Sequence, residues 1–295
     1  MRAVSRHVVA ALLLGAALAC ASGSPTVPPP PPPPPPPSPP PNPWTLVWAD
    51  EFSDTAGASI DTTKWRFDPG DGCPGVCGWG NNEREYYRSA RENIFQTGNG
   101  ELAIVARTAS PADSLRCYYG PCLYTSAKIT TRGKLSVYPG RVEARIKLAA
   151  GQGLWPAFWM LGDNIGTVGW PTCGELDIME NKGSQPTVTS SAVHGPGYSG
   201  NTPFAHQTAT TATDFHLYAV EWDAQSIRYY VDSRLHYGVS RATVTSHGDW
   251  VFDQTFFIIL NQAVGGNFDG NPRSDTILPA TMLVDYVRVY RPTTR

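Results

Sequence analysis

Three carboxylates within six residues form the stretch of the chain best suited to chemistry. Glu175, Asp177 and Glu180 stand in the run Glu-Leu-Asp-Ile-Met-Glu. Side chains alternate between the two faces of a strand, so a regular strand would separate Glu180 from the other two acids. One extra residue at Ile178-Met179, a β-bulge, would return Glu180 to their face. Three acids on one face repel each other, and this pattern indicates catalysis more than a solvated face paired with Lys or Arg.

Tryptophans flank the three acids. Trp155 and Trp159 lie just upstream, and Trp170-Pro171 leads directly into the acidic run. Flat aromatic rings combine a large apolar face with a polar edge, which suits stacking on pyranose rings. Paired carboxylates beside tryptophans therefore predict a surface that binds and cleaves a polysaccharide.

At these residues the chain resembles glycoside hydrolase family 16, and within it the endo-β-1,3-glucanases (laminarinases). These members carry the longer acid motif Glu-x-Asp-x-x-Glu, as this chain does, whereas lichenases and xyloglucan transglycosylases have Glu-x-Asp-x-Glu. The resemblance extends through further segments in order along the chain: residues 46–52, 78–83, 140–145, 194–198, 260–267 and 285–290.

The chain from residue 44 to residue 295 reads as a single all-β domain. Apolar and polar residues alternate over 141–148, and the runs 218–222 and 227–231 flank a turn at 223–226. No segment has the length and periodicity of a substantial helix. The family resemblance implies a β-jelly roll, a sandwich of two curved antiparallel sheets with a substrate cleft across the concave one.

The resemblance also implies the roles of the acids. The reaction would be endo-acting hydrolysis of β-1,3-glucan, and of mixed-linkage β-1,3-1,4-glucan, with retention of configuration and without a cofactor for catalysis. Glu175 would be the nucleophile and Glu180 the general acid and base. Asp177 would hydrogen-bond the nucleophile, and its negative charge would help to keep Glu180 protonated near neutral pH.

Six further residues are expected to contact the substrate. Two are stacking platforms, three are polar contacts to sugar hydroxyls or to the acids, and Asn261 is expected to line the cleft. Core tryptophans and a structural histidine are the alternative interpretations for members of this set, which comprises Trp155, Trp159, Asn82, Arg132, His194 and Asn261.

A structural calcium ion is expected far from the acids. Asp285 shares strand parity with Leu283 and Val287, so an acid on that face needs a partner. By resemblance the ligands would be the Asp285 carboxylate and the backbone carbonyls of Glu51 and Gly100, and oxygen ligands suit calcium. The alternative is a buried salt bridge.

Composition narrows the class of partner. Of 295 residues, 41% are hydrophobic and 16% are charged, and nine Trp and thirteen Tyr favour a carbohydrate partner. The formal net charge is −2 and becomes −4 once Arg2 and Arg6 are removed with residues 1–19. A mildly acidic chain lacks the basic footprint that binds phosphate backbones, which argues against nucleic acid. We expect a monomer whose partner is a β-glucan.

The N-terminus carries the features of an exported protein. Arg2 and Arg6 precede an apolar run that is too short to span a membrane, which predicts a signal peptide over 1–19. Cys20 follows Ala17-Leu18-Ala19, so free secretion and a lipid anchor at Cys20 both stay open. Residues 20–43 form a proline-rich tether, with an unbroken proline run over 28–37 that favours polyproline II. We expect a secreted or cell-surface location.

Five cysteines remain after Cys20. Export permits disulfides, and the close pairs Cys73/Cys77 and Cys117/Cys122 lie in loops rich in Gly and Pro. Either two local bridges form and leave Cys173 free, or the loops are cross-linked. A zinc site at Cys73 and Cys77 is a third interpretation, although the sequence offers no convincing second half.

Two other functions compete with the glucanase. The first is hydrolysis of another β-linked polysaccharide, because agarases and carrageenases share the bulged motif. A sulfated substrate would favour a cluster of Lys or Arg near Trp155 and Glu175, and the sequence has no such cluster there. The second is glucan binding without catalysis, as in relatives that have lost the acids, and the presence of Glu175 and Glu180 argues against it.

Overall fold

The computed structural model describes residues 43–293. The predicted signal peptide and all of the predicted tether except Pro43 lie outside the described residues. In the part that is described, two large β-sheets account for most of the chain, and no helix is long and apolar enough to cross a membrane.

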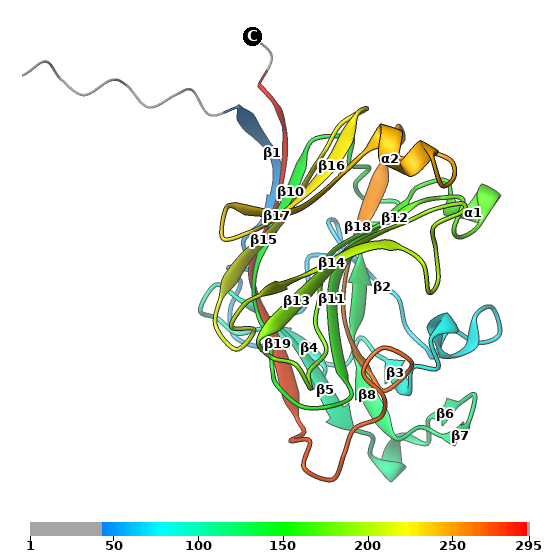
Figure 1. The fold of residues 1–295 in the computed structure, drawn as a ribbon. Helices are drawn as coiled ribbons and strands as arrows, with labels where there is room; N and C mark the ends of the chain where they lie inside the picture. The colour runs from blue at the N-terminus through cyan, green and yellow to red at the C-terminus, as the bar shows by residue number, and fades with distance from the viewer. Residues whose placement is uncertain (1–42, 294–295) are drawn as a thin grey trace, which may run out of the picture. The chain divides into compact units, whose positions relative to one another are not determined.

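The larger sheet has ten strands and runs through the N-terminal and C-terminal strands of the domain (Figure 1). β1 pairs with β19 and β4 pairs with β5, while the other strands follow one another across the sheet. In that order they are β17 (Arg234–Ser240), β16 (Ser226–Val231), β15 (His216–Trp222), β10 (Arg141–Lys147), β19 (Ala280–Pro292), β5 (Leu102–Thr108), β8 (Tyr124–Ser126) and β3 (Glu85–Tyr87), with β1 (Trp44–Asp50) and β4 (Ile94–Gln96) at the side.

The smaller sheet has seven antiparallel strands and packs against the first. Its order is β14 (Phe204–Ala209), β13 (Val188–His194), β12 (Glu175–Glu180), β11 (Leu154–Gly162), β18 (Phe256–Val264), β9 (Lys128–Thr130) and β2 (Arg66–Phe67). The remaining elements are short: β6 (Arg116–Cys117), β7 (Gly120–Pro121), η1 (Cys77–Gly80), η2 (Pro111–Asp113), α1 (Ile165–Val168) and α2 (Arg241–Thr245).

The main core lies between the two sheets. Each strand contributes every second side chain to it, which is what the alternation in the sequence predicts. The ten-stranded sheet supplies Val142, Ile146 and Val287, and the seven-stranded sheet supplies Phe158 and Leu260. Because the inward side chains of the seven-stranded sheet fill this core, the intervening residues of β11, β12 and β18 point to the sheet's opposite face. We call that opposite face the acid-bearing face.

The strands predicted from alternation are confirmed. β15 and β16 form the expected hairpin, with Tyr218 opposite Val231 and Trp222 opposite Ile227. The expected absence of a long helix also holds for the described residues, in which the longest α-helix spans five residues. Short strands joined by turns at Gly and Pro therefore account for the all-β class.

The predicted environment of Asp285 is wrong. β10 and β19 shift register between Arg145 and Ile146, which face Tyr286 and Val284, so Asp285 is an extra residue at a bulge. Strand parity changes there, and Val284 and Val287 point to the core while Leu283 and Asp285 do not. The Asp285 side chain is 33% exposed and forms an ion pair with Arg145 at 2.6 Å. It is therefore a partly exposed group and has no need of a buried partner.

The cysteines follow one of the two open alternatives. Cys73 is bonded to Cys77 and Cys117 to Cys122, while Cys173 is a buried free thiol. The zinc interpretation is wrong, because both of its sulfurs are consumed in a disulfide.

Candidate active site

The bulge expected in β12 is present and sets the geometry of the three acids. Along β11, Ala157 faces Glu180 and Trp159 faces Asp177, so β12 has one residue more than its partner between these points. Ile178 and Met179 both turn into the core. Glu180 is thereby returned to the acid-bearing face with Glu175 and Asp177.

Glu175 is held by a tryptophan that the sequence placed beside the acids without indicating its individual role. The indole Nε1 of Trp170 donates a hydrogen bond to Glu175 Oε2 at 2.5 Å. The Trp170 ring is 48% exposed and lies 6.2 Å from the ring of His194. An exposed indole fixed over a carboxylate can stack on a sugar while its N–H stabilises the carboxylate anion.

Glu180 has an equivalent partner on the neighbouring strand. Trp155 Nε1 donates to Glu180 Oε1 at 3.0 Å, and the Trp155 ring stacks on Phe268 with centroids 4.8 Å apart. The ammonium group of Lys182 lies over the same Phe268 ring at 4.7 Å. Trp155 therefore lies on the acid-bearing face beside Glu180, where the sequence predicted a stacking residue.

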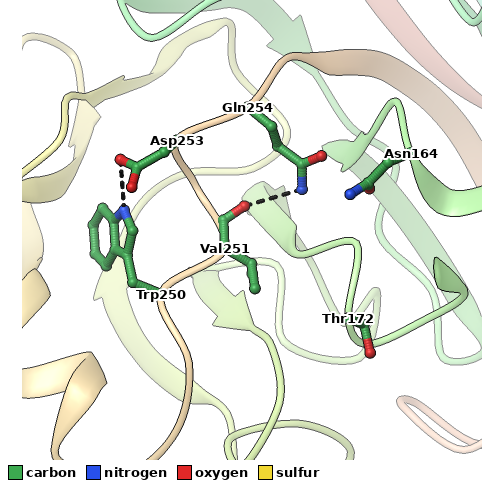
Figure 2. Close-up of a pocket in the computed structure, with 6 residues that line it drawn as sticks. All are labelled: Asn164, Thr172, Trp250, Val251, Asp253 and Gln254. Carbon is green, nitrogen blue, oxygen red and sulfur yellow. Dashed lines mark hydrogen bonds between the residues drawn. The ribbon is translucent and has the colours of Figure 1, made fainter.

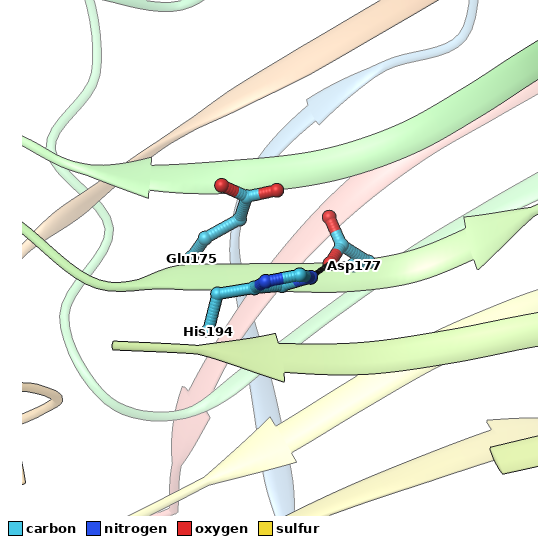
Figure 3. A group of neighbouring side chains, drawn as sticks. All are labelled: Glu175, Asp177 and His194. Carbon is cyan, nitrogen blue, oxygen red and sulfur yellow. Dashed lines mark ion pairs between the residues drawn. The ribbon is translucent and has the colours of Figure 1, made fainter. Parts of the chain in front are cut away.

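Asp177 lies between the two glutamates and beside His194. His194 Nε2 is 3.1 Å from Asp177 Oδ2, and β12 and β13 place His194 directly opposite Glu175 (Figure 3). One ligand atom from each of Glu175, Asp177 and His194 lies within 4.8 Å of the others. His194 is thus a neighbour of the acids, as predicted.

Burial and mutual repulsion raise the pKa of all three acids. Burial, followed by the charge of Asp177, raises the pKa of Glu175 to about 8. Burial and the charge of Glu175 raise the pKa of Glu180 to about 7. The pKa of Asp177 is raised well above its ordinary value by burial and by Glu180. The patch therefore retains at least one proton at neutral pH, as a general acid requires.

The lower pKa falls on Glu180, which is the reverse of the order expected for an acid and a nucleophile. Each glutamate accepts a hydrogen bond from an indole N–H, and this bond lowers the pKa of its carboxyl group. The bond from Trp170 to Glu175 is 2.5 Å and the bond from Trp155 to Glu180 is 3.0 Å. The shorter bond favours the negative charge on Glu175.

Trp159 is fixed from behind by a chain of hydrogen bonds. Its Nε1 donates to Asn261 Oδ1 at 2.7 Å, and Asn261 Nδ2 donates to the Tyr87 hydroxyl at 3.0 Å. Tyr87 in turn donates to the buried carboxyl of Glu83 at 3.2 Å. Asn261 is 6% exposed, and its side chain links the Trp159 indole to the Tyr87 hydroxyl behind it.

Two predicted contacts lie further from the acids. Asn82 is exposed and donates from Nδ2 to Asn267 Oδ1 at 2.9 Å, which ties the loop after η1 to the loop after β18. Arg132 is exposed, with its guanidinium 5.6 Å from the ring of Phe257. Phe257 packs with Trp159 in a small apolar cluster. Arg132 therefore borders the acid-bearing face, and neither residue touches the three acids.

The two predicted carbonyl ligands of calcium stand next to strands that pair with the same edge of β19. β1 ends at Asp50 opposite Val287, and β5 begins at Leu102 opposite Val284. Because β10 occupies the other edge of β19, β1 and β5 lie on the same edge; Glu51 directly follows β1, and Gly100 stands two residues before β5. Asp285 Oδ2 accepts a hydrogen bond from Arg145, and the Glu51 carboxylate accepts two from Arg288. Carboxylate and carbonyl oxygens are of the type that calcium takes as ligands.

A known family of proteins matches the segment of the chain that contains Glu175, Asp177 and Glu180. The model described as "Glycosyl hydrolases family 16" matches residues 82–274. The chain belongs to this family. It is therefore a glycoside hydrolase with a jelly-roll fold, and the reaction of this family needs no cofactor.

Similar proteins agree with the family. A beta-glucanase of Rhodothermus marinus is 42% identical over 259 residues, which cover 84% of this chain and 85% of the relative. A glucan endo-1,3-beta-glucosidase A1 of Niallia circulans is 38% identical over 83% of this chain, and the match spans 38% of that longer protein. The laminarinase catalytic domain of Thermotoga maritima superposes with a TM-score of 0.79 at 43% identity, covering 86% of this chain and all of that domain.

The residues that the sequence analysis missed are those that hold the acids and the rings. Trp170 stands five residues before Glu175 and carries a weak sequence signal, since it is an aromatic residue just before an acidic strand. Tyr87 and Glu83 lie more than 70 residues from Trp159 in the sequence, and their connection to it through Asn261 exists only in the folded chain.

Proposed function

We propose that this hydrolase is an endo-acting, retaining β-1,3-glucanase. The observation that carries the proposal is the bulge at Ile178, which puts Glu175 and Glu180 on one face with an indole N–H on each carboxylate. Retention requires two carboxyl groups close enough for one of them to attack the sugar directly. The names of the relatives, which include glucan endo-1,3-beta-glucosidase and laminarinase, supply the substrate class.

In the first step, the Glu175 carboxylate attacks the anomeric carbon and the glycosidic C–O bond breaks. Glu180 donates its proton to the leaving oxygen, which departs as a sugar hydroxyl. The N–H of Trp170 holds Glu175 in place. The negative charge of Asp177 disfavours ionisation of both glutamates at once, so one of the acids stays protonated. The raised pKa of Glu180 makes the proton available at neutral pH.

In the second step, Glu180 is a carboxylate and takes a proton from water. The water oxygen attacks the same anomeric carbon, the bond from that carbon to Glu175 breaks, and the β configuration is restored. Two inversions at one carbon give net retention. Stacking on Trp155, Trp159 and Trp170 would hold the sugar rings in register while both steps take place.

Mixed-linkage glucan is a second substrate that the relatives support. A protein described as a non-specific endo-beta-1,3(4)-glucanase is 35% identical and has a TM-score of 0.75. A relative named keratan-sulfate endo-1,4-beta-galactosidase is 31% identical over 84% of the chain, so other β-linked polymers belong in the test. Lys128, a cation near Trp159, is paired with Asp68 at 3.4 Å and offers little to a sulfate.

Release of reducing ends from laminarin, lichenan, agarose and carrageenan tests the proposal. We expect laminarin to be the best substrate, with lichenan second. Glu175→Gln should abolish the activity and leave binding of laminarin intact. Glu92→Gln changes a glutamate whose side chain is 51% exposed and serves as the matched control. Activity of Glu175→Gln within tenfold of the native enzyme would refute the assignment of the nucleophile.

We further propose that calcium binds at Asp285 with the carbonyls of Glu51 and Gly100. The convergence of β1 and β5 on one edge of β19 supports this site. An ion there would join three strands by oxygen ligation and would act on stability, not on the reaction.

We also propose that the chain is exported and acts as a monomer, either free or tethered to a membrane by a lipid on Cys20. The signal-like segment 1–19, the proline-rich segment 20–43 and the two disulfides support export. Cell fractionation of the native chain and of Cys20→Ser tests the anchor, and sedimentation of the purified enzyme tests the monomer. If the native chain is tethered, Cys20→Ser should move it from the membrane fraction to the medium.

A further inference from the structure

A pocket of about 340 Å³ lies outside the groups that handle the reaction. Its lining combines three neutral polar side chains, two apolar ones and one acid, and it comprises Asn164, Thr172, Gln254, Trp250, Val251 and Asp253 (Figure 2). The pocket is a shallow hollow that is widely open to solvent; its volume is at the small end of the range for ligand pockets and suits one or two sugar rings lying on the surface.

The pocket is placed by the three central strands of the seven-stranded sheet. β11 ends two residues before Asn164, β12 begins three residues after Thr172, and β18 begins two residues after Gln254. Its lining is therefore drawn from the ends of the strands that carry Trp159, Glu175 and Asn261. Glu175 begins β12 and Glu180 ends it, so the pocket lies at the Glu175 end of the acid strand.

A direct connection joins the pocket to the loop that leads into Glu175. Gln254 Nε2 donates to the carbonyl of Cys173 at 2.8 Å and to the carbonyl of Val251 at 3.0 Å. Thr172 stands on the same loop, between Trp170 and Glu175. One loop therefore carries both a lining residue of the pocket and Trp170, whose indole donates to Glu175.

The chemistry of the lining is that of a carbohydrate site. The Trp250 ring is fixed by the hydrogen bond from its Nε1 to Asp253 Oδ1 at 3.1 Å, and by the Arg241 guanidinium 5.4 Å from its centroid. Arg241 is also paired with Asp253 at 2.8 Å, so the two charges offset each other. Figure 2 shows the Trp250 ring on one side of the pocket and Asn164 and Thr172 on the other. A ring face opposite amide and hydroxyl groups suits a hexopyranose.

We infer that this pocket binds a hexopyranosyl unit of the substrate, remote from the bond that is cleaved. The inference rests on the proposed glucanase function. The unit has two sources, the main β-1,3-linked chain or a single glucosyl branch on it, and both present the same ring and hydroxyls. Binding there would strengthen the attachment of long or branched glucans without changing the chemistry at Glu175.

The test compares substrates that reach the pocket with one that does not. Trp250→Ala should lower kcat/KM by about tenfold on polymeric glucan, and by less than twofold on an aryl β-laminaribioside, which fills only the positions next to the acids. About tenfold corresponds to about 1.4 kcal/mol. A loss on linear laminarihexaose would assign the unit to the main chain, and a loss confined to a branched laminarin would assign it to the branch.

Two further variants guard against a folding artefact, because Trp250 packs on Phe252 at 5.1 Å. Thr172→Phe fills the pocket from an exposed position and should reproduce the selective loss. Tyr138→Ala removes a ring that is 58% exposed and lines a different pocket, and should change neither substrate.

The outcomes separate the two proposals. If the native enzyme does not hydrolyse any β-glucan, the proposed function fails. If the native enzyme is active, equal losses on the short and long substrates would make Trp250 a structural residue and overturn the subsite. Unchanged kinetics in both Trp250→Ala and Thr172→Phe would overturn it as well.

Discussion

Glu180→Gln should stabilise the protein at high pH and leave its stability at low pH nearly unchanged. Burial, and then the charge of Glu175, raise the pKa of Glu180 above its ordinary value. A carboxyl with a raised pKa in the folded state contributes stability below its unfolded pKa, and this contribution is lost as pH rises through the folded pKa. Gln is neutral at every pH, so it does not suffer this loss.

The size of the effect follows from the pKa. Raising it from 4.5 to about 7, at about 1.4 kcal/mol per pH unit, gives about 3 kcal/mol at pH 9 as an upper limit, because part of the side chain meets water. For a domain of about 250 residues, this corresponds to a melting temperature higher by about 6 to 12 °C. At pH 4 Glu180 is neutral in the folded state and largely neutral in the unfolded state, so the difference should almost vanish.

Thermal melts followed by circular dichroism at pH 4, 6.5 and 9 measure this difference. Comparing pH values within one variant cancels the hydrogen-bonding cost of replacing a carboxyl by an amide. Glu92→Gln is the control, since solvent screens its exposed charge and its effect should stay small throughout. If Glu180→Gln shifts the melting temperature equally at pH 4 and pH 9, the raised pKa and its cause are refuted.

Three other outcomes test separate parts of the structure. Glu180→Ala should lose activity on laminarin yet regain turnover of an aryl β-glucoside oligomer with azide, giving a β-glycosyl azide; an α-azide product, seen by NMR, would mean an inverting route. A calcium chelator should lower the melting temperature of the native protein but not that of Asp285→Ala. Calcium at a hundredfold excess over Kd adds about 2.7 kcal/mol to the free energy of unfolding. Identical melts of the native protein with and without chelator would exclude a stabilising ion. Phe158→Ala should cost about 3–5 kcal/mol in denaturant titration, because the side chain is fully buried between the sheets; a cost below 1 kcal/mol would contradict its place in the core.

The acids and their bulge could be predicted because their signal is local. Alternation with a period of two determines which side chains share a face. A bulge between Asp177 and Glu180 is the arrangement that puts all three acids on the same face. The β15–β16 hairpin was predictable for the same reason. Trp155 and Trp159 are also local, since they lie on the strand that directly precedes β12 in the chain and pairs with it.

The tertiary structure decided everything that depends on strands far apart in the sequence. Asn261 could be placed on the acid-bearing face, yet its function in orienting Trp159 depends on Tyr87, which is 174 residues away. The bulge at Asp285 follows from pairing with β10, and no feature of β19 alone reveals that strand parity changes there. The pocket beside Glu175 is assembled from three strand ends, so its lining is scattered over Asn164 to Gln254. The period of two shows which side chains of a strand share a face. Which strands lie side by side is determined by the packing of the whole core.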